Sequence, residues 1–411
     1  MSKFLSRRRA ILGIFSMSAA VCAVLAGGSM ISTVSAADPI KIGELNSYGR
    51  FAAFTQPYRN GWQLAVDEIN AAGGVNGRML EVISRDDGAK PGDAVRVAEE
   101  LVSREKVDVL FGTFLSNVGL AVSDYAAQNK ALFLAAEPLS DAITMAKGNR
   151  YTFRMRPNTY MQTKMLVEQA KTLGVKRWAI VAPNYAYGQS AAENFKRLIK
   201  EAIPDAEIVA EQYPALGKID AGATVSALAQ AKPDGVFNVL FGGDLAKFVR
   251  EGNVRGLFEK RTVLSLLTGE PEWLSLLKDE APKGWIVTGY PVNQVEGDGH
   301  KMFADAYKAK FNDTPRLGSL LGYVMIQSIK AAVEKAGGTD TEKMVDALKG
   351  LEFDTPIGMM TMRGDDHQAT MGAWIGKIDV KDGKGVMTDW AYADGKDYMF
   401  SAEEVMKTRP Q

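Results

Sequence analysis

A serine at the start of an expected helix offers the clearest chemistry in this sequence. Val107–Phe111 is a short apolar run typical of a buried strand, residues 112–115 predict a turn, and Ser116 and Asn117 then open a helix. Such a helix start directs unpaired backbone N–H groups into the crevice above the sheet, where an anionic ligand group can bind. Ser116 adds a hydroxyl at that point. The alternative is that Ser116 or Asn117 only caps its own helix.

Two further segments end at the same expected edge of the sheet. One is the stretch Asn46–Asn60, which we expect to be a loop and which carries an unusual load of aromatic residues, namely Tyr48, Phe51, Phe54 and Tyr58. The other is Glu137–Ser140, which follows the strand predicted at residues 131–136. Ligands of parallel sheets collect at the carboxyl ends of the strands, so these loops could line a site. Ordinary packing of the aromatic side chains is the alternative.

Short apolar strands alternate with amphipathic helices along most of the chain. This alternation predicts an α/β fold with parallel sheets and right-handed crossovers. The first series of strands is expected at residues 41–45, 80–83, 107–111 and 131–136, with a strand at 151–155 leading away. A second series is expected at residues 178–182, 208–213, 235–240 and 262–267. Two doubly wound series of similar length predict two lobes with a cleft between them.

The last third of the chain is expected to return to the first lobe and then leave it. A strand at 285–290, helices at 300–311 and 320–336, and hairpin-like segments at 358–362 and 374–378 follow one another. We therefore expect lobe 1 to comprise residues 37–156 and 285–355. Lobe 2 is expected to comprise residues 157–284 and 356–411.

The first 36 residues have the pattern of a secretion signal. A basic start with Lys3 and Arg7–Arg9 precedes the apolar run 11–25, and a small-residue cleavage site ends at Ala36. Twin-arginine export and ordinary secretion both fit this pattern. Cleavage would remove the only cysteine, Cys22, so we expect an exported periplasmic protein without thiols or disulfides.

Composition argues against several function classes. Basic and acidic residues number 49 each and no basic stripe appears, so we expect no nucleic-acid partner. No nucleophile elbow or phosphate-binding loop is present, so we expect neither an enzyme nor a cofactor. Asp86 and Asp87 lack further ligands at fitting spacing and are interpreted as capping loop N–H groups. Two isolated histidines, His300 and His367, make no metal set.

Several motifs together resemble one protein family. These are the run Glu68–Arg78 with its Gly73-Gly74 pair, then Asp86-Asp87, then Gly112 with Ser116, then Tyr187-Gly188. In this order they are similar to the type I periplasmic solute-binding proteins, in the branch of the leucine/isoleucine/valine-binding proteins of ABC importers. The resemblance implies a Venus-flytrap fold with three hinge crossings and a solute bound between the lobes. It also implies an inner-membrane ABC permease as partner, and we expect the protein to be a monomer.

The resemblance also implies which residues bind the solute. Ser116 matches the anion-binding serine, with Asn117 beside it, and the loop that supplies backbone N–H groups falls at Glu137-Pro138-Leu139. Here the sequence departs from the family pattern, because Leu139 stands where threonine is often found. The aromatic side chains expected around the solute are Phe54, Tyr185, Tyr187 and Phe241. The acidic residue that holds an ammonium group falls near Glu270, offset by a few positions.

This departure leaves the solute class open. A buried ammonium group needs a carboxylate partner, because an unpaired buried charge costs several kcal/mol. If Glu270 does not reach the site, an aromatic or other hydrophobic monocarboxylate fits. If Glu137 or Glu270 does reach it, a branched-chain or aromatic amino acid or a neutral amide fits better. A ligand-sensing module for a signalling receptor is the alternative to the importer.

Overall fold

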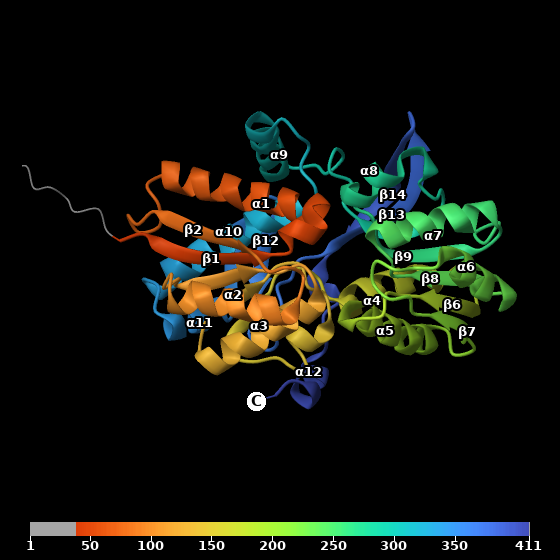
Figure 1. The fold of residues 1–411 in the computed structure, drawn as a ribbon, viewed down its shortest axis with the longest axis horizontal. Helices are drawn as coiled ribbons and strands as arrows, with labels where there is room; N and C mark the ends of the chain where they lie inside the picture. Colours follow the sequence, from red (N-terminus) through yellow and green to blue (C-terminus); the bar gives the residue numbers. More distant parts are fainter. Residues whose placement is uncertain (1–37, 411) are drawn as a thin grey trace, which may run out of the picture. The chain divides into compact units, whose positions relative to one another are not determined.

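The first five strands of the described chain form one sheet. The structure is a computed structural model, and it describes residues 38–410. The strand order is β2-β1-β3-β4-β5, and every neighbouring pair is parallel (Figure 1). The strands are β1 (Ile40–Asn46), β2 (Leu80–Asp86), β3 (Val109–Gly112), β4 (Phe133–Ala135) and β5 (Thr152–Arg154). The accompanying helices are α1 (Tyr48–Ala71), α2 (Pro91–Ser103), α3 (Ser116–Asn129) and the short η1 (Asp141–Ile143). The predicted signal segment, with Ala36 and Cys22, lies outside the described residues.

The prediction of an aromatic loop at residues 46–60 is wrong, because α1 already begins at Tyr48. The helix is bent at Phe51, whose backbone angles are not helical, and it contains Pro57. Proline removes one backbone hydrogen bond inside a helix, which normally argues against helical structure. The carbonyl of Ala53, four residues earlier, instead lies 3.5 Å from a guanidinium nitrogen of Arg316. A long-range contact thus helps to satisfy the group that Pro57 leaves unbonded.

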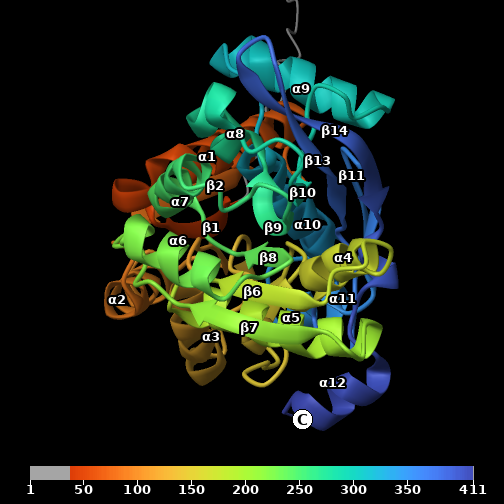
Figure 2. The same ribbon diagram turned by 90° about the vertical axis from the view of Figure 1, so that its right-hand side faces the viewer.

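A seven-stranded sheet forms the second lobe, with the order β14-β13-β10-β9-β8-β6-β7 (Figure 2). Its parallel strands are β6 (Arg177–Val181), β7 (Glu207–Gln212), β8 (Gly235–Asn238), β9 (Thr262–Gly269) and β10 (Ile286–Gly289). The antiparallel hairpin of β13 (Ala373–Lys381) and β14 (Lys384–Ala393) extends its edge. The helices of this part are α4 (Thr159–Ala170), α5 (Ala186–Ala202), α6 (Ala221–Gln230), α7 (Gly242–Val254), α8 (Pro271–Leu277) and the short η2 (Lys278–Glu280).

The segment between β10 and β13 returns to the first lobe. It contains α9 (Asp298–Phe311), α10 (Leu317–Ala336), α11 (Thr341–Leu348) and the hairpin of β11 (Leu351–Thr355) and β12 (Gly358–Met362). Glycines let α10 approach α1 closely: a Cβ atom at Gly61 would lie 1.9 Å from the Ser319 carbonyl oxygen. The strand expected to open the returning part of lobe 1 at residue 285 is β10, and it pairs with β9 in the seven-stranded sheet instead.

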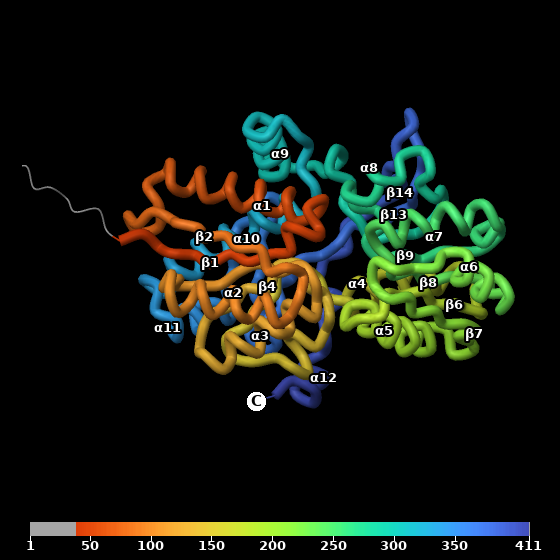
Figure 3. The backbone as a smooth tube through the Cα atoms, in the orientation of Figure 1, coloured from red at the N-terminus to blue at the C-terminus, as the bar shows by residue number. Residues whose placement is uncertain are grey.

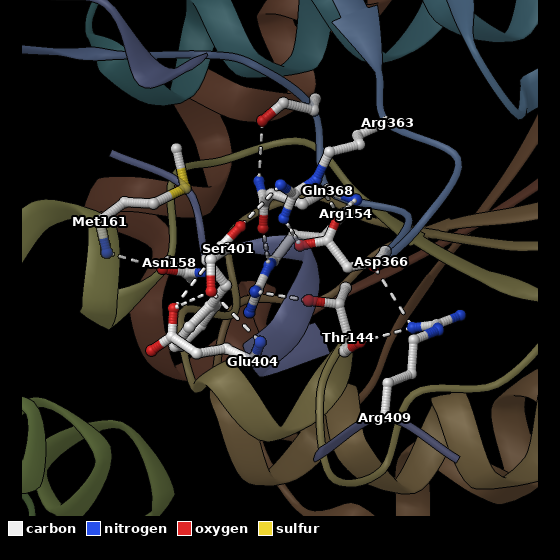
Figure 4. A network of polar contacts seen from close by, with 12 residues as sticks. Thr144, Arg154, Asn158, Met161, Arg363, Asp366, Gln368, Ser401, Glu404 and Arg409 are labelled. Atoms are coloured by element: carbon white, nitrogen blue, oxygen red, sulfur yellow. Dashed lines mark hydrogen bonds and ion pairs between the residues drawn. The ribbon is translucent and has the colours of Figure 1, made fainter. Parts of the chain in front are cut away.

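The chain therefore passes between the two sheets three times, after β5, after β10 and after β12, a path that can be followed in Figure 3. The first and third connections are bonded to each other. Gln368 donates from Nε2 to the Arg156 carbonyl at 3.0 Å. It also accepts from Arg154 Nε at 2.6 Å (Figure 4). After β14, the short η3 (Gly395–Asp397) and α12 (Ala402–Thr408) follow, and Arg409 donates to the Asn149 carbonyl at 2.7 Å. The α/β fold with two doubly wound lobes is confirmed.

Candidate functional site

The turn from β3 into α3 has an uncommon backbone. Gly112 has φ +123° and its missing side chain leaves room for the Leu45 carbonyl, which a Cβ atom would approach to 2.3 Å. Thr113 adopts φ +64°, a left-handed conformation that is strained for a β-branched residue. The Thr113 hydroxyl is buried and has no hydrogen-bond partner among the described residues. Strain and an unsatisfied polar atom at the carboxyl end of a strand mark this turn as a candidate site.

Ser116 does not cap its own helix, which corrects one of the two interpretations drawn from the sequence. It is the first residue of α3, and Leu115 is the residue before the helix. The buried Ser116 Oγ accepts hydrogen bonds from the backbone N–H groups of Leu139 and Ser140, both at 3.1 Å. The predicted loop is therefore attached to the helix start. The Ser116 hydroxyl proton stays available for donation, and the N–H groups of the first turn lack intrahelical acceptors.

Four charged side chains from three parts of the chain meet at the lobe interface. Arg156 follows β5 and forms an ion pair with Glu270, with both side chains 5% exposed. Glu137 Oε2 accepts from Asn46 Nδ2 at 3.4 Å. Glu272, on α8 of the second lobe, accepts at Oε1 from the Gly318 N–H of α10 at 3.1 Å, while its Oε2 is buried without a partner among the described residues. Arg156 is thus the guanidinium that faces this group of three buried carboxyl groups.

Burial dominates the electrostatics of these carboxyl groups. Desolvation raises the pKa of Glu137 to about 8, although Arg156 and the Asn46 hydrogen bond act in the opposite direction. Desolvation likewise raises the pKa of Glu270 to about 8 against the attraction of Arg156, with Glu272 and Glu137 adding repulsion. It also raises the pKa of Glu272. Removal from water thus outweighs Arg156, and at Glu272 also Arg316, so an additional positive charge nearby would favour the ionised carboxylates.

Aromatic rings from both lobes surround this charged group. From the first lobe, Phe54 of α1 stacks on Phe114 with ring centroids 5.4 Å apart. Phe54 also meets Trp273 of α8 in the second lobe, at 3.6 Å. Further ring contacts join Phe51 and Phe114 to Phe241, and Phe241 to Tyr185, Tyr187 and Trp273, at 5.8 to 6.4 Å. These seven rings, from Phe51, Phe54, Phe114, Tyr185, Tyr187, Phe241 and Trp273, are called the aromatic cluster below.

Several unsatisfied polar atoms lie around the same cluster. Buried atoms without a hydrogen-bond partner among residues 38–410 include Thr113 Oγ1, Asn117 Oδ1, the Tyr187 hydroxyl, Glu272 Oε2 and Trp273 Nε1. Buried polar groups are normally hydrogen-bonded, and each exception calls for an explanation. Donors and acceptors from both lobes that lack protein partners are what a polar solute between the lobes would satisfy.

The structure brings most of the predicted site residues together. Phe54, Tyr185, Tyr187 and Phe241 belong to the aromatic cluster, while Ser116, Asn117, Glu137 and Glu270 lie in or beside its polar part. Leu139 contributes its N–H group, and the Pro138 ring lies against Gly119 of α3, where a Cβ atom would come within 2.8 Å. The solute contacts of these ten residues remain a prediction.

Sequence reasoning missed Arg156, Glu272, Trp273, Phe114 and Thr113. Trp273 and Glu272 begin α8 directly after β9, so the strand-end rule used for the other loops applies to them as well. The interpretation of Asp86 and Asp87 as capping residues is confirmed. Asp86 accepts from the N–H groups of Gly49 and Gly88 at 2.9 Å, and Asp87 accepts from Ala89 at 2.8 Å.

Comparison with known proteins identifies the family. The family model described as periplasmic binding protein matches residues 39–384, so the chain belongs to this family. The leucine-, isoleucine-, valine-, threonine- and alanine-binding protein of Pseudomonas aeruginosa is 30% identical over 82% of this chain and 89% of its own length. The resemblance to the leucine/isoleucine/valine-binding branch is thereby confirmed.

Solved structures share the fold at lower sequence identity. A solute-binding protein of an ABC transporter from Rhodopseudomonas palustris, in complex with 3,4-dihydroxybenzoic acid, is 24% identical with a TM-score of 0.78, covering 87% of this chain and 98% of its own. The closed conformation of a leucine-, isoleucine-, valine-, threonine- and alanine-binding protein from Brucella ovis is 22% identical with a TM-score of 0.78, covering 89% and 98%.

Proposed function

We propose that this protein is the periplasmic solute-binding component of an ABC importer and that it binds an amino acid with an apolar or aromatic side chain. The observation that carries this proposal is the group of three buried carboxyl groups around Arg156, beside the aromatic cluster. A protonated nitrogen of the solute would favour the ionised form of one of these carboxyl groups and pair with it. A solute whose only charge is a carboxylate offers them no such partner.

Each part of an amino acid has a matching region. The solute carboxylate fits the start of α3, where backbone N–H groups and the Ser116 hydroxyl offer donors. The nitrogen fits the carboxyl groups. The side chain fits the aromatic cluster, whose rings come from both lobes. Since the P. aeruginosa relative is named for binding aliphatic amino acids and threonine, its name supports the same class.

Binding between the lobes gives a route to transport. A solute that touches both lobes stabilises the closed arrangement by its differential affinity for that state. One lobe would comprise residues 38–156 and 290–372, and the other residues 157–289 and 373–393, so that the hinge contains Arg156 and Gln368. A monomer closed in this way would be recognised by an inner-membrane permease after export to the periplasm. No helix among residues 38–410 is long and apolar enough to cross a membrane.

A thermal-shift screen of the mature protein tests the solute class. The panel contains branched-chain and aromatic amino acids, benzoates, phenylpropanoid acids and amides. A saturating ligand raises the melting temperature because it binds the folded state only. We expect shifts with apolar or aromatic amino acids and none with benzoates. Shifts with benzoates or amides alone would contradict the proposal that the solute is an amino acid. The solute class would then be the one that gives the shift.

Uptake of the identified solute separates an importer from a sensor. Cells with the intact protein and its permease should accumulate labelled solute, and deletion of the gene should abolish that uptake at low concentration. Unchanged uptake in the deletion strain, with a lost chemotactic or transcriptional response, would favour the signalling module instead.

A further inference from the structure

We propose that Glu137, rather than Glu270, is the carboxylate that receives the solute nitrogen, and that it releases a proton when the solute binds. This inference rests on the proposed function, because it assigns one residue of that site to one group of the solute. It differs from what the family resemblance implies, which places the ammonium partner near Glu270.

Glu270 already has a partner. Its carboxylate forms a buried ion pair with Arg156, which lies in the first connection between the lobes. An ammonium group that displaced Arg156 would leave that buried guanidinium without its hydrogen-bonded partner, and that is strongly unfavourable. Glu270 is therefore occupied in holding α8 of the second lobe to the hinge.

Glu272 also forms a hydrogen bond across the lobe interface. Its Oε1 accepts from the Gly318 N–H at 3.1 Å, near the start of α10, where the helix dipole favours a negative charge. Both carboxyl groups of the second lobe thus contact groups outside that lobe. Glu270 is thus bonded to Arg156, whereas Glu272 keeps one buried oxygen, Oε2, without a partner among the described residues.

Glu137 differs from both because it lies on the loop that meets Ser116. Its hydrogen bond from Asn46 is long, 3.4 Å, and it engages Oε2 only. No described residue donates a hydrogen bond to Oε1. Glu137 also has the right neighbours, because the same loop supplies the Leu139 and Ser140 N–H groups that meet Ser116. The carboxylate and ammonium of an amino acid share one carbon atom, so their protein partners must lie close together, and Glu137 and Ser116 satisfy that condition.

The surroundings of Glu137 determine whether its carboxyl group is protonated. The titratable groups that face it are Arg156 from the hinge, Glu270 and Glu272 from the start of α8, and Tyr58 from α1. With burial raising the pKa of Glu137 to about 8, its carboxyl group is mostly protonated at pH 7 in the unliganded protein. A bound ammonium group favours the ionised form and lowers that pKa, so the proton is released. Affinity should therefore rise with pH up to about 8, the pKa of the free form.

Isothermal titration calorimetry in two buffers with different ionisation enthalpies measures this proton directly. The probe is the amino acid that gives the largest thermal shift with the wild type. At pH 7 we expect release of nearly one proton per solute by the wild type. Glu137→Gln should lose this release and weaken binding by roughly 10- to 100-fold, the size of a lost hydrogen bond to a charged group. Glu270→Gln should keep the proton release.

Glu44→Gln is the matched control. Glu44 is another buried carboxyl group whose pKa burial raises to about 8, but it lies on β1 and accepts from Tyr48 and Ser84. This variant should keep both affinity and proton release. If Glu137→Gln does not fold, Glu137→Asp should bind more weakly and still release the proton.

The outcomes separate this inference from the proposed function. Absence of binding by the wild type to every amino acid of the panel would contradict the proposed function. Binding by the wild type without proton release, or proton release that survives Glu137→Gln, would contradict the assignment of Glu137 alone. Loss of both binding and proton release in Glu270→Gln, with both intact in Glu137→Gln, would return the role to Glu270.

Discussion

Arg154 and Arg156 lie two residues apart and are both buried, but their surroundings differ. Arg154 donates to neutral acceptors, namely Gln368 Oε1 at 2.6 Å, the Ser140 carbonyl and Thr144 Oγ1 at 2.9 Å (Figure 4). Burial lowers the pKa of Arg154 to about 10, so it still carries its charge at neutral pH. Arg156 instead faces carboxyl groups that it compensates only in part.

The difference separates a scaffold from a site. Around Arg154, donors and acceptors are matched within the protein, which fixes the first and third connections relative to each other. Around Arg156, polar atoms such as Glu272 Oε2 and the Tyr187 hydroxyl have no partner among the described residues. A satisfied buried network makes the hinge specific, whereas an unsatisfied one is completed by a solute. The following variants test whether this division holds.

Arg154→Met should give the largest effect. Three buried acceptors lose a charged donor at once, so we expect the free energy of unfolding to fall by about 3 to 5 kcal/mol. Urea denaturation of the unliganded protein measures this loss. Arg150→Met is the control, because Arg150 pairs with Glu342 and Asp346 at the surface, and it should cost less than about 1 kcal/mol. Equal losses in both variants would contradict the scaffold role of Arg154.

Arg156→Met should destabilise in a pH-dependent way. Without Arg156, the pKa values of Glu137 and Glu270 rise beyond about 8, far above those of the unfolded chain. When the pKa of a carboxyl group is higher in the folded than in the unfolded protein, its contribution to stability is fully present below the unfolded pKa. That contribution is lost as the pH rises through the folded pKa. The loss of unfolding free energy should therefore be larger at pH 8 than at pH 5.5, by up to about 0.8 kcal/mol, because each of the two groups is half ionised at pH 8 in the wild type and contributes at most about 0.4 kcal/mol there.

Urea denaturation across this pH range provides the measurement, and Arg154→Met provides the reference. The acceptors of Arg154 are an amide, a carbonyl and a hydroxyl, none of which titrates between pH 5 and 8. Its destabilisation should therefore stay nearly constant across the range. A flat pH profile for Arg156→Met would mean that Arg156 does not change the ionisation of its carboxyl neighbours in this range.

Local patterns predicted the strands and the loops that carry the site, but not the contacts between lobes. Ser116 and Glu137 are recognisable because each follows an apolar strand, at positions where parallel sheets expose loops. The ion pair of Arg156 with Glu270 joins residues 114 positions apart, and no local periodicity contains that information. The same holds for Trp273 on Phe54. At residues 48–60, Pro57 and the bend at Phe51 hid a helix that tertiary packing stabilises.

Ser116→Ala should weaken solute binding by about 1 to 3 kcal/mol. The hydroxyl joins the Leu139 and Ser140 N–H groups to α3, and it offers a donor to the solute carboxylate. Ser123→Ala on the same helix is the control, since Ser123 Oγ bonds Thr152 Oγ1 at 2.9 Å instead of the site loop. Calorimetry should show weaker solute binding by Ser116→Ala than by Ser123→Ala. Similar affinities in wild type and Ser116→Ala would remove Ser116 from the site.

Tyr187→Phe should have the smallest effect and the most diagnostic sign. The Tyr187 hydroxyl is buried without a described partner, so its removal should leave unliganded stability unchanged or raise it by up to about 1 kcal/mol. Affinity for the solute should fall by a factor of about 10 or less, because we expect the solute to form the hydrogen bond that this hydroxyl lacks in the protein. Tyr290→Phe should show the reverse, lower stability with unchanged affinity, because its hydroxyl already bonds His300 Nε2 at 2.6 Å. Thermal unfolding and calorimetry distinguish the two. If both variants lose stability alone, the Tyr187 hydroxyl belongs to the scaffold rather than to the site.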